Sequence, residues 1–522
     1  MRAITAEEVK QLEDFAIKKG INSRILMEIA GMKVANIAAH EIKRVRYATV
    51  ICGNGGNGGD GFVTARYLHN AGIKTDVYLT APEGKISSPD SRANYEILKN
   101  IGLNVVELNE NNLSQLKQSL LSSDIAIDAI FGIGFKKEIK GFIENLFDLI
   151  NTTKREVKNR RHYLIVSVDV PSGIDLSGSS PNKCVEADIT VTFDYPKIGL
   201  LKYPASKAAG KIITTSIGIP KPNPVEPDFL PFIEQQRAPK ESIEGVQITD
   251  ARFVSSIVPR RKVDSHKGTA GHILVIAGSS GMMGAAVLTS NSAMRTGTGL
   301  VTLCVPENIK NYVNSMSLEA VVTSVDDISK KACQSRALAL GPGLSTGREI
   351  SKLVKSVLTD PNINVPIVLD ADGLNSIEDA SLLKECGKNL VITPHPGEFA
   401  RLSKVPVDDI QKDRIGYATR FAVEFGVTVV LKGAYTVIAG KDKTLFINPT
   451  GNPAMASAGV GDVLTGIITS LAGQGMSCFH AAVAGVYIHS MAANLATSIK
   501  GEHGLIASDI IDSIPFAMES IL

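Results

Sequence analysis

The sequence predicts an α/β protein of two domains, each built on a mostly parallel sheet flanked by helices. Short apolar runs alternate along the chain with longer helix-forming segments, and most of these runs end at a glycine or an aspartate. This rhythm is typical of parallel sheets that carry helices on both faces. A proline-rich stretch separates two such series, and 522 residues exceed what a single core usually holds.

The first series predicts the elements of the N-terminal domain. We expect a polar helix within residues 1–20, strands over residues 47–52, 75–79, 124–128 and 163–169, and a helix over residues 61–69. Parallel strands bring their carboxyl ends to one edge of a sheet, where such folds bind ligands. The polar residues that end or follow these strands should therefore gather there: Asn57, Asp60, Asp128 and Asp169.

The break between the two series falls in residues 219–240, which carry prolines at positions 220, 222, 224, 227, 231 and 239. Proline lacks a backbone donor and favours an extended chain, so this stretch reads as a linker. The predicted domains are accordingly residues 1–218 and residues 245–522, joined by a proline-rich linker over residues 219–244.

A second series of strands and turns follows the linker. We expect strands over residues 272–277, 337–340, 366–370, 390–393 and 427–431, and a helix over residues 463–471. Glycine-containing turns come after these strands: GSSG at 278–281, GPG at 341–343, ADG at 371–373, PHPGE at 394–398 and KG at 432–433. The two series do not look like copies of each other, so the chain is predicted to be a fusion of unlike domains.

Composition and charge exclude several classes of protein. With 44% hydrophobic residues, 21% charged residues and a net charge of +2, the chain is globular and shows no basic stripe for nucleic acid. No run of about 18 apolar residues predicts a membrane span. The N-terminus is polar, and the six cysteines form no C-x-x-C pair. These features predict a cytoplasmic protein with reduced thiols, without a membrane or nucleic-acid partner.

The first glycine-rich loop is GNGGNGGDG at residues 53–61. Its spacing is not that of a dinucleotide fingerprint, and it lacks the Gly-Lys-Ser/Thr ending of a P-loop. The carbonyl oxygens of its asparagines suit a weakly charged cation or the hydroxyls of a ligand. A glycine turn without function is the alternative, and Asp128 and Asp169 could each be helix caps. Several carboxylates converging with this loop favour a site.

The second glycine-rich loop, Gly459-Val460-Gly461-Asp462, opens the helix expected over residues 463–471. Its glycines leave N–H groups free to bind an oxyanion, and the helix dipole adds positive potential. Asp462 is suited to deprotonating a hydroxyl while charge develops on a phosphate. We expect the helix dipole to keep Asp462 ionised. An ordinary helix cap is the alternative.

Three motifs of the first half together resemble the NAD(P)H-hydrate epimerase domain, a Rossmann-like fold: GNGGNGGDG, DAIFGIG at 128–134 and DVPSGID at 169–175. The resemblance covers about residues 1–215. It implies that this half interconverts the R and S epimers of hydrated NADH or NADPH at C6 and binds potassium through Asn57, Asp128 and Ser172. Asp169 would be the acid/base, which agrees with the need for a sheltered carboxylate in proton transfer.

The same resemblance implies a set of contacts to the hydrate: Gly56, Asn57, Gly58, Gly59, Asp60, Gly132, Ile133, Gly134, Phe135, Lys136, Lys137, Glu138 and Asp169. One position departs from the family. The family loop usually reads Asn-Asn-Gly-Gly-Asp, and here Gly56 stands in the first place, which removes one hydrogen-bonding side chain.

The second half resembles the ribokinase-like superfamily and, more closely, the ADP- or ATP-dependent NAD(P)H-hydrate dehydratases. The matching pieces are HKGTAG at 266–271, GPG at 341–343, DAD at 370–372, HPGE at 395–398, LKG at 431–433 and NPTGNPAMASAGVGD at 448–462. The resemblance covers about residues 245–522. It implies that ADP or ATP, with Mg²⁺, phosphorylates the C6 hydroxyl of the S-hydrate, after which phosphate leaves and NAD(P)H is restored.

The dehydratase resemblance implies two further sets of contacts. The hydrate would touch Ala286, Gly343, His395, Pro396, Gly397, Glu398, Phe399, Ala400, Arg401 and the catalytic Asp462. The adenine nucleotide would touch Lys432, Gly433, Ala434, Tyr435, Thr436, Asn452, Pro453, Ala454, Met455, Ala456, Ser457, Ala458, Gly459, Val460 and Gly461. Glu398 and Asp370 are candidates for organising Mg²⁺ through water, whereas Asp372 is equally well explained as a structural cap. Val460 replaces the usual serine without removing the backbone anion hole.

These resemblances predict a bifunctional repair enzyme that acts as a homo-oligomer on small molecules, hydrated NADH or NADPH and an adenine nucleotide. One alternative is a ribokinase-like vitamin-precursor or sugar kinase with an accessory N-terminal domain. HPGE together with NPTGNP favours the dehydratase. A second alternative makes the first half a non-catalytic binding module, which Asn57, Asp128, Asp169 and Ser172 argue against. Nothing in the residues separates ADP from ATP, although the domain order of the family favours ADP.

Overall fold

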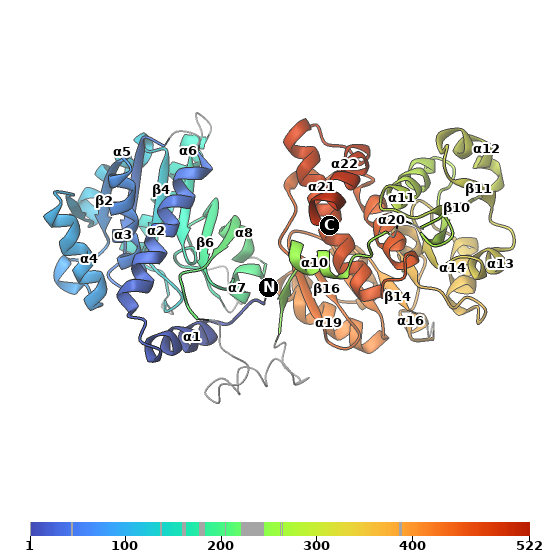
Figure 1. Ribbon diagram of the computed structural model, residues 1–522, viewed down its shortest axis with the longest axis horizontal. Coiled ribbons are helices and arrows are strands. Elements are labelled where there is room, and N and C mark those ends of the chain that lie inside the picture. Colours follow the sequence, from blue (N-terminus) through green and yellow to red (C-terminus); the bar gives the residue numbers. More distant parts are fainter. Residues whose placement is uncertain are drawn as a thin grey trace. The chain divides into compact units, whose positions relative to one another are not determined.

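The computed structural model describes the chain apart from residues 1, 43–44, 136–137, 159–162, 177–182, 204, 221–244, 262, 264 and 386–388. The described residues divide into two compact units, one before and one after residues 221–244 (Figure 1). The predicted linker thus lies almost entirely outside the described residues. None of the described helices has the length and apolarity needed to cross a bilayer.

The N-terminal unit contains a seven-stranded parallel sheet in the order β3-β2-β1-β4-β5-β6-β7. Its strands are β1 (Tyr47–Cys52), β2 (Lys74–Leu79), β3 (Val105–Glu107), β4 (Ile125–Ala129), β5 (Leu164–Val168), β6 (Ile189–Phe193) and β7 (Lys211–Thr215). The strand order reverses its direction between β1 and β4. Ligands of doubly wound folds bind at that switch point, beyond the carboxyl ends of the two strands.

Helices cover both faces of this sheet (Figure 1). They are α1 (Ala6–Lys18), α2 (Ser23–Glu41), α3 (Gly56–Asn70), η1 (Glu83–Lys85), α4 (Pro89–Asn100), η2 (Glu110–Asn112), α5 (Leu113–Ser122), α6 (Phe142–Lys158), α7 (Ile198–Leu201) and α8 (Ala205–Ala209). Successive residues of β1 point to opposite faces: Val50 joins the core under α2 and α3, and Ile51 joins the core under α5 and α6. Both faces are therefore buried.

The C-terminal unit contains a ten-stranded sheet in the order β11-β10-β9-β12-β13-β14-β15-β16-β17-β8. Its strands are β8 (Gln247–Ile248), β9 (His272–Ile276), β10 (Leu300–Val305), β11 (Val321–Ser324), β12 (Ala337–Leu340), β13 (Ile367–Leu369), β14 (Leu390–Ile392), β15 (Thr428–Leu431), β16 (Thr436–Ala439) and β17 (Leu445–Asn448). The sheet is parallel from β11 to β15, and only β16 runs antiparallel to both of its neighbours.

The helices of the C-terminal unit centre on α20 (Val460–Gly473) (Figure 1). The others are α10 (Ala251–Ile257), α11 (Met283–Arg295), α12 (Glu307–Met316), α13 (Ile328–Cys333), α14 (Arg348–Thr359), α15 (Ala371–Asn375), α16 (Ser381–Glu385), α17 (Pro396–Ser403), α18 (Val407–Lys412), α19 (Arg414–Phe425), η4 (Pro453–Met455), α21 (Cys478–Lys500) and α22 (Ala507–Ile521). A Cβ on Gly466 would lie 2.0 Å from Ser292 Oγ, so a glycine is what lets α20 pack tightly on α11.

The structure confirms the predicted α/β class with two mostly parallel sheets. Every strand expected from the sequence is present, with ends that differ by at most one residue. Two helices begin earlier than predicted: α3 starts at Gly56 rather than at residue 61, and α20 starts at Val460 rather than at residue 463. In both cases part of the glycine-rich loop itself forms the first helical turn.

Candidate active sites

In the N-terminal unit, the glycine-rich loop after β1 passes directly against the end of β4. A Cβ on Gly53 would lie 1.9 Å from the carbonyl oxygen of Ile130, and a Cβ on Gly58 would lie 1.9 Å from that of Gly53. Only glycine fits at these two positions. The helix α3 begins at Gly56 without a side-chain cap. Its first backbone N–H groups are therefore available to a ligand at the switch point of the sheet.

The three predicted potassium ligands meet around the backbone of Phe131. Asn57 Nδ2 donates to the Phe131 carbonyl oxygen at 3.1 Å, and the Phe131 N–H donates to Ser172 Oγ at 2.8 Å. Asp128 accepts from the Ser172 N–H at 2.8 Å and from Ser167 Oγ at 2.7 Å. The structure thus brings together residues from the first turn of α3, from the end of β4 and from the loop after β5.

Asp128 is a buried carboxylate without a cationic partner among the described side chains. Burial raises the pKa of Asp128, while hydrogen bonds from Ser172, Ser167 and the Ile130 N–H lower it. The described residues contain no group of three or more His, Cys, Asp or Glu side chains placed to hold a metal. A single carboxylate among neutral oxygens is the ligand set of a weakly charged cation rather than of zinc.

Asp169 forms a buried ion pair with Lys197, at the carboxyl ends of β5 and β6. Lys197 Nζ donates to Asp169 Oδ1 and, at 2.9 Å, to Thr192 Oγ1. Thr192 Oγ1 in turn donates to Asp169 Oδ1 at 3.1 Å. The Lys197 side chain is 1% exposed, and Asp169 adopts a left-handed backbone with φ of 62°. A left-handed backbone at a buried charged residue is typical of functional positions.

Two further carboxyl groups lie in the field of this ion pair. Burial raises the pKa of Asp60 well above its usual range, Asp169 and Glu13 raise it further, and Lys197 opposes them. Burial and Asp169 likewise raise the pKa of Glu13, although this side chain keeps an open path to solvent. The Ile4 N–H donates to the Pro196 carbonyl oxygen at 3.0 Å, which ties the segment preceding α1 to the residue before Lys197. The carboxyl groups of Glu13, Asp60 and Asp169 therefore all interact electrostatically with the Lys197 side chain.

The remaining predicted contacts of the epimerase loop lie in different settings. Phe135 stacks on Phe131 with ring centroids 4.0 Å apart, and a Cβ on Gly132 would lie 3.4 Å from Asn57. Glu138 points outward, where it pairs with Lys140 at 2.8 Å and is 70% exposed. Lys136 and Lys137 lie outside the described residues.

In the C-terminal unit, the first turn of α20 faces a lysine and an aspartate from the sheet. Its N-cap Gly459 has a left-handed φ of 83°. A Cβ on Gly461 would lie 3.4 Å from Lys432 Nζ and 3.8 Å from Asp370 Oδ2. The predicted anion cradle is therefore brought together with charged groups from the ends of β13 and β15.

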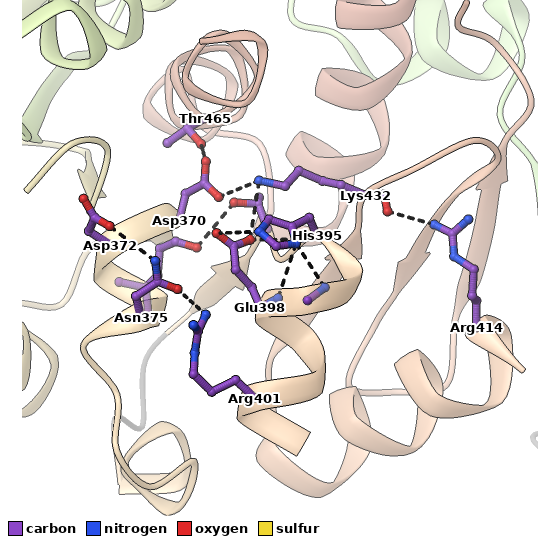
Figure 2. A network of polar contacts seen from close by, with 12 residues as sticks. Asp370, Asp372, Asn375, His395, Glu398, Arg401, Arg414, Lys432 and Thr465 are labelled. Carbon is purple, nitrogen blue, oxygen red and sulfur yellow. Dashed lines mark hydrogen bonds and ion pairs between the residues drawn. The ribbon is translucent and has the colours of Figure 1, made fainter. Parts of the chain in front are cut away.

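Asp370 joins three elements of the site (Figure 2). Its carboxylate accepts from Lys432 Nζ at 2.8 Å and from Thr465 Oγ1 at 2.7 Å, and it is 1% exposed. Glu398 Oε2 lies 3.9 Å from the same Lys432 Nζ. Burial alone lowers the pKa of Lys432. The negative charges of Asp370, Glu398 and Asp462 outweigh this effect and raise the pKa of Lys432 overall. Asp370 is the N-cap residue of α15 by position, yet its side chain makes no capping hydrogen bond there.

The protonation of Asp462 differs from the sequence-based expectation. Burial raises the pKa of Asp462 to about 7, with further increases from Asp370 and Asp372 and a decrease from Lys432. The expectation that the helix dipole keeps Asp462 ionised was wrong for this site, because desolvation and two nearby carboxylates outweigh the dipole. A pKa near neutrality is that of an effective general base.

His395 and Glu398 form a reciprocal cap at the start of α17 (Figure 2). His395 Nδ1 accepts from the N–H groups of Gly397 at 3.0 Å and Glu398 at 3.3 Å. Glu398 Oε2 accepts from the His395 N–H at 2.8 Å. Since Nδ1 accepts these bonds, His395 carries no proton there. The HPGE motif therefore fixes Glu398 beside Lys432 through local backbone bonds.

Asp372 has a structural role. It accepts from the Ser345 N–H at 2.8 Å and from Asn375 Nδ2 at 3.3 Å. Asn375 Oδ1 accepts in turn from Arg401, one of the predicted hydrate contacts (Figure 2). These hydrogen bonds, from Asp372 through Asn375 to Arg401, hold the Arg401 guanidinium at the edge of the site.

Three other predicted contacts are occupied by packing or capping. Ala286 is fully buried, 3.0 Å from where a Cβ of Gly278 would lie. Phe399 is fully buried against Phe421, with ring centroids 5.1 Å apart. Asn452 caps η4 by accepting from the Ala454 N–H at 3.0 Å. Their contacts with ligands stay predictions.

Lys197 and Thr465 are functional candidates that the sequence reasoning missed. Lys197 stands in TFDYPKIG just after β6, and Thr465 lies inside a helix. A lysine after an apolar strand is a weak signal of a functional residue, and a threonine one helical turn after Asp462 is a weaker one. Only the folded structure shows that Lys197 contacts Asp169 and that Thr465 contacts Asp370.

Glycine-rich helix starts set against charged residues at parallel strand ends define an α/β enzyme of the class that handles phosphate and nucleotide ligands. A family model described as NAD(P)H-hydrate dehydratase matches residues 273–516, and one described as YjeF-related protein N-terminus matches residues 23–199. The bifunctional NAD(P)H-hydrate repair enzyme of Moorella thermoacetica is 37% identical over 100% of this chain and 97% of the relative. The chain belongs to the family of bifunctional NAD(P)H-hydrate repair enzymes.

A second relative agrees with this assignment. The bifunctional NAD(P)H-hydrate repair enzyme of Escherichia coli is 32% identical, over 95% of this chain and 89% of the relative. The solved structure of an ADP/ATP-dependent NAD(P)H-hydrate dehydratase from Bacillus subtilis, co-crystallised with ATP and Mg²⁺, is 36% identical. It covers 53% of this chain and 99% of its own, with a TM-score of 0.48. The family matches confirm both resemblances read from the motifs.

Proposed function

We propose that the chain repairs hydrated NADH and NADPH with two separate sites. The N-terminal unit interconverts the R and S epimers, and the C-terminal unit dehydrates the S form at the expense of ADP or ATP. The observation that carries this proposal is the match to bifunctional relatives over the whole chain. We assign the epimerase to residues 1–218 and the dehydratase to residues 245–522, limits that contain the two matched segments.

In the epimerase site, Asp169 and Asp60 would act as a base and an acid. The C6 carbon of the hydrate carries a hydroxyl and the ring nitrogen, so it can invert by ring opening. Asp169, held by Lys197, takes the hydroxyl proton as the C6–N bond breaks, and Asp60 gives a proton to the nitrogen. Rotation about the adjacent bond and the reverse steps close the ring with the opposite configuration. The raised pKa of Asp60 supports its role as the acid.

In the dehydratase site, Asp462 would take the proton of the C6 hydroxyl as its oxygen bonds to the terminal phosphorus of the nucleotide. The bond from that phosphorus to the leaving nucleotide breaks, and the N–H groups at the start of α20 stabilise the charge. Loss of phosphate from C6 and of a proton from C5 then restores the ring double bond. The pKa of about 7 for Asp462 supports this assignment.

Asp370 and Glu398 would hold Mg²⁺ through water. Their carboxylates converge on Lys432 Nζ at 2.8 Å and 3.9 Å, so this part of the site already accommodates a cation between acidic groups. Mg²⁺ neutralises phosphate charge during transfer. The other residues of the site would orient the hydroxyl and exclude water.

A single assay tests both activities. Purified protein mixed with R- and S-hydrate, ADP or ATP, and Mg²⁺ is expected to restore the near-ultraviolet absorbance of reduced nicotinamide in full. Chelating Mg²⁺ should stop the recovery, because the phosphates would lose their counter-ion. A stable phosphorylated product without restored cofactor would instead favour the vitamin-precursor or sugar kinase. Recovery that stops at the S fraction would favour a non-catalytic N-terminal unit.

We propose potassium as the cation of the epimerase site, held by Asn57, Asp128 and Ser172. The unpaired charge of buried Asp128 supports it. Replacing K⁺ by tetramethylammonium, which is too large for an oxygen cage, is expected to slow epimer exchange about tenfold, the effect of one charge-assisted contact. Epimer exchange followed by chromatography measures the rate.

The matched variants for the potassium test are Asp128→Asn and Asp76→Asn. Asp76 accepts from Ser119 Oγ at 2.9 Å and lies away from the glycine loop, near the start of β2. Asp128→Asn should abolish the difference between K⁺ and tetramethylammonium, and Asp76→Asn should keep it. A wild-type rate that is the same in both salts would contradict the potassium proposal.

Three expectations from the sequence remain proposals about the whole protein. We propose ADP as the preferred nucleotide, a homo-oligomeric state and a cytoplasmic location. The described cysteines support the last of these, since Cys52, Cys184, Cys304, Cys333 and Cys478 are all free thiols.

A further inference from the structure

Arg414 is a buried cation that none of the steps above uses. It is the first residue of α19 and is 8% exposed. Its guanidinium donates to three carbonyl oxygens: that of Ala434 at 2.6 Å, that of Leu431 at 2.9 Å and that of Lys432 at 3.0 Å. Figure 2 shows it on the side of the Lys432 backbone away from Asp370.

The placement of Arg414 is electrostatically costly. A cation at a helix N-terminus opposes the helix dipole, and no described carboxylate pairs with this one. The adjacent Asp413 bonds to the Gly416 N–H at 2.9 Å and lies 3.4 Å from Arg420. Burial lowers the pKa of Arg414 to about 10, so the side chain remains charged at neutral pH. Within the described part of the chain, these three carbonyl oxygens are its hydrogen-bond partners, and Arg414 Nε is buried without one.

Two of those carbonyls, of Lys432 and Ala434, belong to the turn at residues 432–435 between β15 and β16, and the third is that of Leu431 at the end of β15. Gly433 has a φ of 140°, and a Cβ there would lie 3.0 Å from Arg414 Nη2. Tyr435 has a left-handed φ of 55°. The guanidinium thus lies against a turn in which two residues have positive φ.

The directions of these carbonyl groups also fix the directions of the backbone N–H groups that follow them. In a trans peptide the C=O and the following N–H point to opposite sides. Because the Lys432 carbonyl points at Arg414, the Gly433 N–H points away from it. The Lys432 N–H is fixed separately by the Pro394 carbonyl oxygen at 2.9 Å, and the Lys432 ammonium by Asp370.

We propose that Arg414 is a positioning residue of the nucleotide site: its planar fork orients the 432–435 turn so that the Gly433 N–H and the Lys432 ammonium both serve the phosphates of the nucleotide. This inference rests on the proposed dehydratase function. Lysine cannot replace arginine in this role, because an ammonium lacks the rigid fork that reaches three carbonyls at once.

The test compares Arg414→Lys with Arg420→Lys in the full chain. Arg420 lies on the same helix, is exposed, and stacks 4.6 Å from the Tyr417 ring centroid, so it is a matched control. We expect Arg414→Lys to raise the KM for ADP or ATP about tenfold or more, as loss of one phosphate donor does, and to change kcat less. The rise in Tm that bound nucleotide produces should also be smaller in Arg414→Lys than in wild type. Arg420→Lys should have the wild-type KM and kcat for the nucleotide. Epimer exchange should be unchanged in both variants.

Arg414→Ala with added guanidinium ion provides the second measurement, at a concentration below that which unfolds the protein. Guanidinium, but not methylammonium, is expected to restore nucleotide affinity. A wild-type KM in Arg414→Lys, or no rescue of Arg414→Ala by guanidinium, would overturn the inference while wild type still uses nucleotide. A wild-type protein that binds neither ADP nor ATP would overturn the dehydratase function and this inference with it.

Discussion

Asp462→Asn is expected to lower the kcat of S-hydrate dehydration by about 10²–10⁴-fold, the usual contribution of a general base. The substitution keeps the shape of the side chain and removes its basicity. Epimer exchange should be unchanged, because it belongs to the other unit. The measurement is the recovery of nicotinamide absorbance from purified S-hydrate with ADP or ATP. Dehydration at the wild-type rate would remove Asp462 from the mechanism.

The pH dependence of the same reaction provides an independent check. The pKa of Asp462 is raised to about 7, so the carboxyl is protonated and inactive as a base below that pH. The kcat/KM for dehydration should therefore rise as the pH increases through about 7, since kcat/KM reports the free enzyme. Lys432 lowers the pKa of Asp462. Lys432→Met should accordingly move the midpoint to higher pH, and an unmoved midpoint would contradict the assignment.

Asp169→Asn is expected to abolish epimer exchange and leave dehydration of the S form intact. With a mixed substrate, cofactor recovery should stop once the S fraction is consumed, leaving the R form. The variant should also lose stability, because the buried Lys197 side chain loses its ion-pair partner. Breaking a buried ion pair from one side costs about 3–5 kcal/mol. Thermal unfolding of the N-terminal unit measures that loss.

A double variant separates the two effects of Asp169. Asp169→Asn with Lys197→Met removes the unpaired charge, so it should regain most of the lost stability while epimer exchange stays absent. Equal loss of both enzymatic activities in Asp169→Asn would contradict the division of labour between the units. Full epimer exchange in the double variant would remove Asp169 from the epimerase mechanism.

The glycine-rich loops and the strands could be predicted from local sequence because each is encoded by neighbouring residues. Apolar runs ending in glycine or aspartate located β1, β4, β5 and β12, and the motifs placed Asn57, Asp128 and Ser172 in one site. The starts of α3 and α20 were missed because a glycine-rich segment has low helix propensity by itself. In the folded chain Gly58, Gly59, Gly61 and Gly459 are instead required by close contacts with neighbouring segments, where an added Cβ would lie 1.9–2.6 Å from another atom.

The electrostatics of the sites could not be predicted in the same way. The pKa of Asp462 depends on Asp370 and Asp372, which lie on a distant segment of the chain and approach it only in the folded state. Lys197 and Arg414 lack any local motif, and burial is what makes their charges significant. Sequence reasoning finds such residues only when a family motif already contains them.

The tight contact at Gly466 has a consequence for altering this enzyme. The helix that carries Asp462 is held from behind, where the Ser292 hydroxyl and the Thr289 carbonyl oxygen would lie 2.0 Å and 2.2 Å from any added Cβ. Asp462, the proposed base, is thus positioned in part by buried atoms of α11. An engineer seeking a new alcohol substrate has latitude in the loops that follow the strands, whereas the hidden side of α20 leaves almost none.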